Sequence, residues 1–211
     1  MKTSRVVEAI IPLLIGALLV GVAGGAYFVM AGVSARPAPG RIEAFVATTV
    51  RNMAIAWHTP NVLNPVPRTP EVIAEGRAHF ADHCASCHAN NGSGDAEMGR
   101  GLYPRAPDMR LPATQRLSDA QLFYIIENGI RLTGMPGWST GTPDGEQQTW
   151  HLVHFIRHLP QITPKEIEQM EAFNPKSPEQ IRQDIEAERF LRGEDPAPAT
   201  EPDHAEAHAH E

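Results

Sequence analysis

The chain has 211 residues, of which 42% are hydrophobic and 20% are charged, so it is apolar enough to bury a core and is not a disordered polymer. Its formal net charge of −7 argues against a nucleic-acid-binding protein, because phosphate recognition requires a basic surface. The charge is unevenly distributed: residues 1–69 are mildly basic, residues 70–160 are nearly balanced and residues 161–211 are strongly acidic. We therefore consider these three regions separately.

The first region begins with an apolar segment, since residues 9–33 carry no charged side chain. About 20 apolar residues span a bilayer as a helix, whereas the apolar part of a cleaved secretory signal has only about 7 to 15. We expect residues 1–35 to be a retained single-pass anchor, with cleavage near Val33-Ser34-Ala35 as the alternative. The bases on either side of this segment do not decide its orientation.

An amphipathic helix is predicted after the anchor, because apolar residues recur there at intervals of three, four and seven and stop before Pro60. Its apolar face either lies on the membrane surface or packs on the next domain, and the sequence leaves both open. The proline-rich stretch that follows predicts an extended linker up to Thr69. The apolar positions are Ile42, Phe45, Val46, Val50, Met53 and Trp57.

The two cysteines of the chain, Cys84 and Cys87, lie directly before His88 in a CxxCH motif. Two cysteines cannot form a disulfide framework for a domain of this size, and a thioredoxin-type CxxC requires a βαβ setting, whereas the flanking sequence is helical. A structural zinc site requires four ligands, and no further pair stands nearby. The motif therefore indicates covalent haem attachment through both sulfurs, with His88 as an axial iron ligand.

Residues 70–160 resemble the class I c-type cytochromes. Gly76 and Phe80 precede the cysteines at the family's spacing, and Trp150 and Phe155 mark the last helix of the domain. The resemblance implies an all-α fold, a class I cytochrome c fold around one covalently attached haem c, in which the first and last helices cross at these residues. It also implies a haem domain outside the cytoplasm, and an electron carrier rather than an enzyme.

The resemblance further implies that Met135 is the sixth iron ligand. A helix before it is well delimited by Ser118 as N-cap, Gln121 in a capping box and Gly129 at its end, and a Gly- and Pro-containing loop then presents Met135. Met98 and Met109 are formal alternatives.

Two further haem contacts are inferred from the resemblance. Arg105 would pair with a haem carboxylate and Trp138 would line the haem edge, although a solvated Arg105 is an open alternative.

The remaining histidines of this domain are expected to be structural or solvated. We expect His79 and His83 to lie on the surface. His151, His154 and His158 recur on one helix face at a spacing that metal ions can use, and a solvated face is the preferred interpretation.

The acidic region predicts two helices of about 8 and 14 residues, which begin at the capping boxes Thr163 with Glu166 and Ser177 with Gln180. The final residues lack apolar bulk, so a mobile tail is expected, whose histidines bind divalent metal ions weakly. These tail histidines are His204, His208 and His210.

The predicted function is single-electron transfer between protein redox partners by a chain anchored in the inner membrane of a bacterium, with its haem domain on the outer, periplasmic side. Two alternatives remain open: a permanent cytochrome subunit of a membrane dehydrogenase or oxidase, and a metal-handling or haem-based sensing protein that uses the histidine tail. The predicted segments are the anchor (1–35), the amphipathic helix and linker (36–69), the haem domain (70–160), the acidic helices (161–192) and the disordered tail (193–211).

Overall fold

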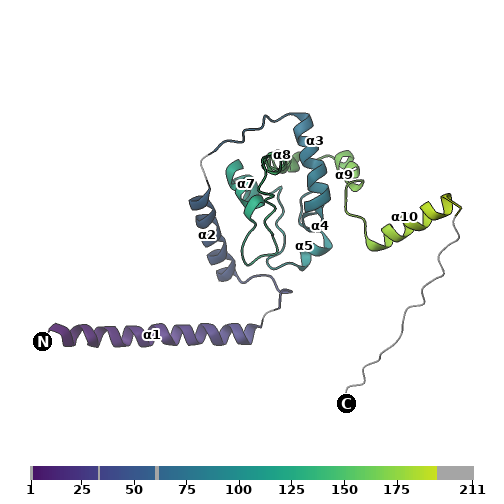
Figure 1. Cartoon of the computed structure of the whole chain (residues 1–211). Coiled ribbons are helices and arrows are strands. Elements are labelled where there is room, and N and C mark those ends of the chain that lie inside the picture. Colours follow the sequence, from purple (N-terminus) through teal and green to yellow (C-terminus); the bar gives the residue numbers. More distant parts are fainter. Residues whose placement is uncertain (1, 33, 60–61, 194–211) are drawn as a thin grey trace, which may run out of the picture. The chain divides into compact units, whose positions relative to one another are not determined.

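The computed structural model describes residues 2–32, 34–59 and 62–193, and within them the chain is helical without a β-strand (Figure 1). The prediction of an all-α fold is therefore confirmed for this part of the chain. Residues 194–211, where the sequence predicts a mobile tail with three histidines, lie outside the described residues. One compact unit ends at Phe173, and the described residues 174–193 belong to a second unit.

Two helices precede the predicted haem domain. Helix α1 (Lys2–Ala31) contains the segment Ile10–Tyr27, which is long and apolar enough to cross a membrane, with a mean hydropathy of 2.1. Helix α2 (Arg41–His58) contains the predicted apolar positions and ends before Pro60 as predicted, and Glu43 near its start accepts a hydrogen bond from the Gly40 amide at 3.3 Å.

The domain that carries the CxxCH motif is built from short helices joined by loops. The predicted N-caps Ser118 and Thr163 are confirmed, since their side chains each accept a hydrogen bond from a backbone amide in the first turn, and Thr69 caps α3 in the same way. Its elements are α3 (Pro70–His79), a π-helical turn (Phe80–Cys84), α4 (Ala85–His88), α5 (Glu97–Gly101), α6 (Pro112–Gln115), α7 (Asp119–Asn128), α8 (Pro143–His158), a 3₁₀ turn (Leu159–Gln161) and α9 (Pro164–Glu171).

Helices α3 and α8 cross at Gly76, and this crossing forms the centre of the core. A Cβ atom on Gly76 would collide with the backbone carbonyl of His151 and would lie 3.1 Å from Cβ of Phe155. One turn later Phe80 packs against Phe155 with ring centroids 5.1 Å apart, and neither side chain is exposed. The helix crossing implied by the family resemblance is present.

The C-terminal half of α8 is tied to the segment that leads into α7. The Arg157 guanidinium donates to Asp119 Oδ1 at 2.8 Å, to the Gln115 carbonyl at 2.8 Å and to the Leu117 carbonyl. Because one guanidinium binds three acceptors of this segment, the segment is held in a defined position. The start of α7, and with it the loop that follows α7, is thereby positioned relative to α8.

The proline-rich stretch differs from the predicted free linker, because part of it packs against α8. His154 Nε2 bonds the Val66 carbonyl at 2.8 Å, and Asn64 Nδ2 donates to the Trp150 carbonyl at 3.3 Å. The Val66 side chain also packs on the core. These residues form no helix, as expected of a linker, but they are bound to α8, because one backbone carbonyl in each segment is hydrogen-bonded by a side chain of the other.

The predicted solvated histidine face of α8 is also wrong. His151 and His154 are 7% and 6% exposed, and His151 Nδ1 lies 2.9 Å from Glu75 Oε2. His158 Nε2 lies 2.8 Å from Glu166 Oε1. The spacing that suggested a possible metal site instead places each histidine against a different neighbouring segment.

The Glu166 carboxylate holds helix α9 on the same unit, because it accepts hydrogen bonds from several donors. Glu166 accepts from Arg77 Nη1 at 3.3 Å and His158 Nε2 at 2.8 Å on Oε1, and from the amide and hydroxyl of Thr163, both at 2.9 Å, on Oε2. Met170 on the same helix is fully buried. This predicted acidic helix is thus docked on α3 and α8 (Figure 1).

The second unit contains helix α10 (Pro178–Leu191), which has the predicted length of 14 residues. Ser177 and Gln180 form the predicted capping box, and Lys176 pairs with Asp184 at 2.5 Å.

The α3–α8 crossing predicts that Gly76→Ala destabilises the protein by roughly 1–3 kcal/mol, because the added methyl group forces the two helices apart. Urea unfolding of the full-length protein, followed by helical circular dichroism, measures this loss. Gly101→Ala is the matched control, since a Cβ at Gly101 meets no atom within 4 Å. Equal unfolding midpoints for the two variants would contradict the proposed close contact.

The hydrogen bonds of Glu166 predict that Glu166→Gln costs roughly 1–3 kcal/mol at neutral pH. Although burial raises the pKa of Glu166, hydrogen bonds from Thr163 and His158 bring it below its ordinary value overall. The stabilisation is therefore complete above pH 4.5 and lost as the pH falls through the lowered pKa. Urea midpoints measured across pH 3 to 7 should converge for wild type and variant at the acidic end, whereas the exposed Glu168→Gln control should track wild type throughout.

Candidate functional site

The CxxCH motif lies where α3 changes its winding. The α-helix ends at His79, a π-helical turn covers Phe80–Cys84, in which the Ala85 amide bonds the Phe80 carbonyl, and α4 then ends at His88. A π turn inserts one residue into an α-helix and re-aims the side chains that follow it, often at functional sites. No periodicity in the sequence indicated this turn.

The imidazole of His88 is buried and neutral. It is 7% exposed, and burial lowers its pKa to about 4 against a smaller opposite effect from the Pro107 backbone. Within the described residues its Nδ1 has no partner at hydrogen-bond geometry. A neutral and incompletely bonded imidazole is the form that binds a metal.

The loop after the motif brings another backbone segment against His88. Gly94, with φ of +72°, donates its amide to the His88 carbonyl at 2.8 Å. A Cβ on Gly94 would collide with the Ala106 carbonyl and would lie 3.0 Å from the Pro107 carbonyl. Glycine is therefore required here for both backbone conformation and space.

Both cysteines are free and half-buried. Burial, with further effects from Cys87 and Asp82, raises the pKa of the Cys84 thiol to about 12, so the side chain is uncharged at neutral pH. No group of three or more His, Cys, Asp or Glu side chains in the described part of the chain is arranged to hold a metal ion. The two cysteines therefore lack the further ligands that a structural zinc site needs.

Met135 lies in a loop that folds back on the end of α7. Gly129, with φ of +68°, ends that helix, and a Cβ there would lie 2.5 Å from the Pro136 carbonyl carbon. The Ile130 amide donates to the Met135 carbonyl at 3.0 Å, and the Met135 amide donates to Thr133 Oγ1 at 3.1 Å. The loop conformation is thus specified by the close contact at Gly129 and by its own hydrogen bonds.

The other two methionines of the domain have different surroundings. Met98 is 59% exposed on α5, whereas Met109 packs against the apolar core. Neither is presented by a comparable loop.

Two sets of contacts connect the Met135 loop to the attachment motif. A Cβ on Gly134 would lie 2.5 Å from Leu102 Cδ2, and one on Gly99, three residues before Leu102, would collide with the Cys87 carbonyl. On the other side the Trp138 ring lies edge-on to His83, with centroids 5.5 Å apart. Segments about 50 residues apart in the sequence therefore meet around the two cysteines.

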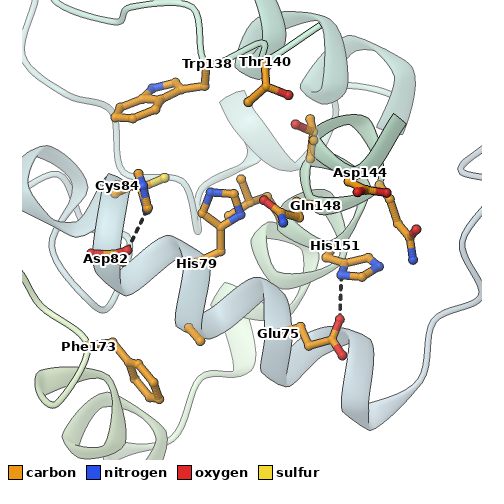
Figure 2. Close-up of a pocket in the computed structure, with 16 residues that line it drawn as sticks. Glu75, His79, Asp82, Cys84, Trp138, Thr140, Asp144, Gln148, His151 and Phe173 are labelled. Carbon is orange, nitrogen blue, oxygen red and sulfur yellow. Dashed lines mark ion pairs between the residues drawn. The ribbon is translucent and has the colours of Figure 1, made fainter. Parts of the chain in front are cut away.

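An open groove of about 1010 Å³ lies beside Cys84, between the end of α3 and the start of α8. Figure 2 shows Trp138 and Thr140 on one side of it and His79 and Asp82 on the other. Three carboxylates and three histidines line the groove, and no lysine or arginine does; they are Glu75, Asp82, Asp144, His79, His83 and His151.

The remaining residues that the sequence analysis singled out differ in how far their side chains are exposed. Trp138 is 38% exposed and lines the groove together with Cys84. Arg105 is exposed, and its guanidinium has no ion pair or hydrogen bond among the described residues. His83 is exposed as expected, whereas His79 is half-buried.

This region matches a known protein family. Residues 71–156 match a family model described as "Cytochrome C oxidase, cbb3-type, subunit III". The match begins in α3 and ends in α8, so it covers the attachment motif, the Met135 loop and the α3–α8 crossing.

The residues present fit a haem of the c type. Two free thiols one helical turn apart and a buried neutral imidazole directly after them form the CxxCH attachment set. The His88 ring is buried and neutral, which is the form in which an imidazole nitrogen binds a metal ion.

The Met135 loop generates a prediction for Gly129→Ala in the haem-loaded protein. The methyl group would collide with the peptide that follows Met135 and would also strain the positive φ, so the absorption band of a methionine–iron bond should weaken at least several-fold. Gly141→Ala is the control, because Gly141 has the same φ of +68° but no atom within 4 Å of its Cβ position. Near-infrared absorption of the oxidised protein reports the bond, and an unchanged band in Gly129→Ala would show that the loop does not present the ligand.

Proposed function

Residues 71–156 form a cytochrome c domain, and on this premise we propose that the chain is a membrane-anchored electron carrier with one haem attached through Cys84 and Cys87. The observation that carries the proposal is the buried neutral His88 at the end of the CxxCH motif, inside the region that matches the family. His88 and Met135 would be the two axial ligands.

The bound haem iron would supply reversible one-electron chemistry. A histidine and a methionine together raise the reduction potential and occupy both axial positions, which favours electron transfer over reaction with small ligands. The chain itself would keep His88 neutral and hold both ligands in place. His88 is held in the core, and the Met135 loop is held by its hydrogen bonds to Ile130 and Thr133.

Two further residues have proposed roles at the haem. Trp138 would cover the haem edge near Cys84, since both line the same groove. Arg105, which is exposed and without a charged partner in the described part of the chain, would pair with a haem carboxylate.

The proposed location is the inner membrane of a bacterium, with α1 as a single span and the haem domain on the outer, periplasmic side. The support is the apolar segment Ile10–Tyr27, together with the family's attachment of haem outside the cytoplasm. The donor and acceptor would be protein redox partners in or near that membrane.

A second candidate function is a permanent cytochrome subunit of an oxidase, and the description of the matching family as an oxidase subunit favours it. Native gel electrophoresis of gently solubilised membranes, stained for haem, separates the two functions. A free carrier should migrate near its own size of 23.1 kDa plus detergent. Co-migration with oxidase activity would replace the carrier proposal with the subunit.

The electron-carrier proposal predicts that Met135→Ala abolishes the methionine–iron absorption band, lowers the reduction potential and lets carbon monoxide bind the reduced iron. The reason is that the variant lacks the thioether ligand and leaves one axial position open. Met98→Ala on exposed α5 is the control and should leave all three properties unchanged. If Met135→Ala matches this control, the sixth ligand is another residue.

The anchor proposal predicts that the full-length protein stays with membranes after washing with 1 M salt and is released only by detergent, since a spanning helix is held by the hydrophobic effect. Immunoblots of the washed membranes and the supernatant measure the distribution. Soluble protein that begins near Arg36 would show instead that the leader is cleaved.

A further inference from the structure

Helix α2 turns its apolar face away from the domain beside which it lies. The six predicted apolar side chains are between 52% and 87% exposed, whereas Ile55 is 6% exposed. Ile55 is two residues from Met53 and two from Trp57, which places it about 200° around the helix, on the opposite side. We call the exposed side the outer face of α2, formed by Ile42, Phe45, Val46, Val50, Met53 and Trp57.

The opposite side of α2 is held by contacts along the whole helix. Near its start Glu43 accepts a hydrogen bond from the Tyr103 hydroxyl, and near its end the His58 ring stacks on Tyr124 of α7 with centroids 6.3 Å apart. Ile55 is buried between these two contacts (Figure 1 shows α2 beside α7). The outer face therefore cannot rotate inward without breaking all three contacts.

The chemistry of the outer face suits lipid. It carries no charged side chain, and Thr49, which lies within it, donates its hydroxyl to the Phe45 carbonyl at 2.7 Å. This hydrogen bond satisfies the hydroxyl within the helix itself. Trp57, at the end of the face, is a residue type enriched at membrane interfaces.

The position of α2 in the chain identifies the bilayer as the surface that this face meets. Residues 32–40, nine in all, connect the membrane-spanning candidate α1 to α2, and they reach at most about 30 Å. Arg36 and Arg41 lie in and just after this connection, where their charges would face lipid phosphates. This placement of α2 depends on the proposed role of α1 as the anchor.

We propose that the outer face of α2 lies in the boundary between headgroups and acyl chains of the same bilayer that α1 spans. Because Asn64 and Val66, just after α2, are bonded to α8, the haem domain then moves together with α2 rather than on a free tether. The α7 side of the domain is held toward the membrane. The carrier thus meets its membrane partners in one orientation.

The test uses the full-length, haem-loaded protein with one copy per lipid nanodisc and a nitroxide label at single introduced cysteines. Val46→Cys and Met53→Cys probe the outer face, and Ala47→Cys and Arg51→Cys, away from it, are matched controls. Outer-face labels should collide with oxygen and be several-fold less accessible than the controls to a water-soluble nickel chelate. Equal nickel accessibility at all four positions would overturn the proposal.

Sedimentation of the same discs through 1 M salt separates failure of this inference from failure of the anchor. Chain that remains in the discs with water-exposed outer-face labels contradicts the inference alone. Chain that leaves the discs contradicts both. Shielding that appears only in discs with two copies would show that a second copy, and not lipid, covers the face.

A second variant tests the orientation of the haem domain without labels on the chain. Replacement of Phe45, Val50 and Met53 by serine should at least halve the quenching of a headgroup-attached fluorophore by the haem, while the haem spectrum stays unchanged. Ala47→Ser combined with Ala54→Ser is the control and should quench like the wild type. Unchanged quenching in the triple variant would contradict an α2-held orientation.

Discussion

The structure depends on the close approach of α3 and α8, which only a residue without a side chain at position 76 permits. The carbonyl of His151 occupies the space that a Cβ on Gly76 would need, and Phe80 can therefore pack on Phe155 in the centre of the core. Helix α3 leads directly into the π turn and the CxxCH motif. Helix α8 carries Arg157, which positions the segment before α7. The two halves of the predicted haem site, the CxxCH segment and the Met135 loop, are thus both positioned by one helix crossing.

Much of the fold follows from local signals in the sequence. Capping boxes at Ser118, Thr163 and Ser177 mark helix starts where the structure has them, because a side-chain oxygen and a backbone amide three residues apart satisfy each other without help from elsewhere. The CxxCH motif and the Met135 loop were found for a similar reason, since their residue types and spacing are local. The α3–α8 crossing was inferred from the family resemblance at Gly76 and Phe155.

Features that depend on contacts between distant segments could not be predicted. Periodicity placed His151 and His154 on one face of α8, but their burial results from Glu75 and from the Val66 carbonyl, which are more than 75 residues away. The π turn after His79 has no periodic signal. The sequence left open whether the apolar face of α2 packs on the domain or meets the membrane, because the Tyr103 and Tyr124 contacts that hold the other side come from distant segments.

The proposed electron transfer depends on one haem attached covalently to the CxxCH segment. The proposed role of Met135 as an iron ligand depends on the same haem. The most direct measurement is the mass of the intact protein purified from its own cells, with fragmentation of the peptide that contains Cys84–His88. We expect the mass of the chain plus one haem, with the added mass on Cys84 and Cys87 together. A chain without haem and with a disulfide between the two cysteines would contradict it.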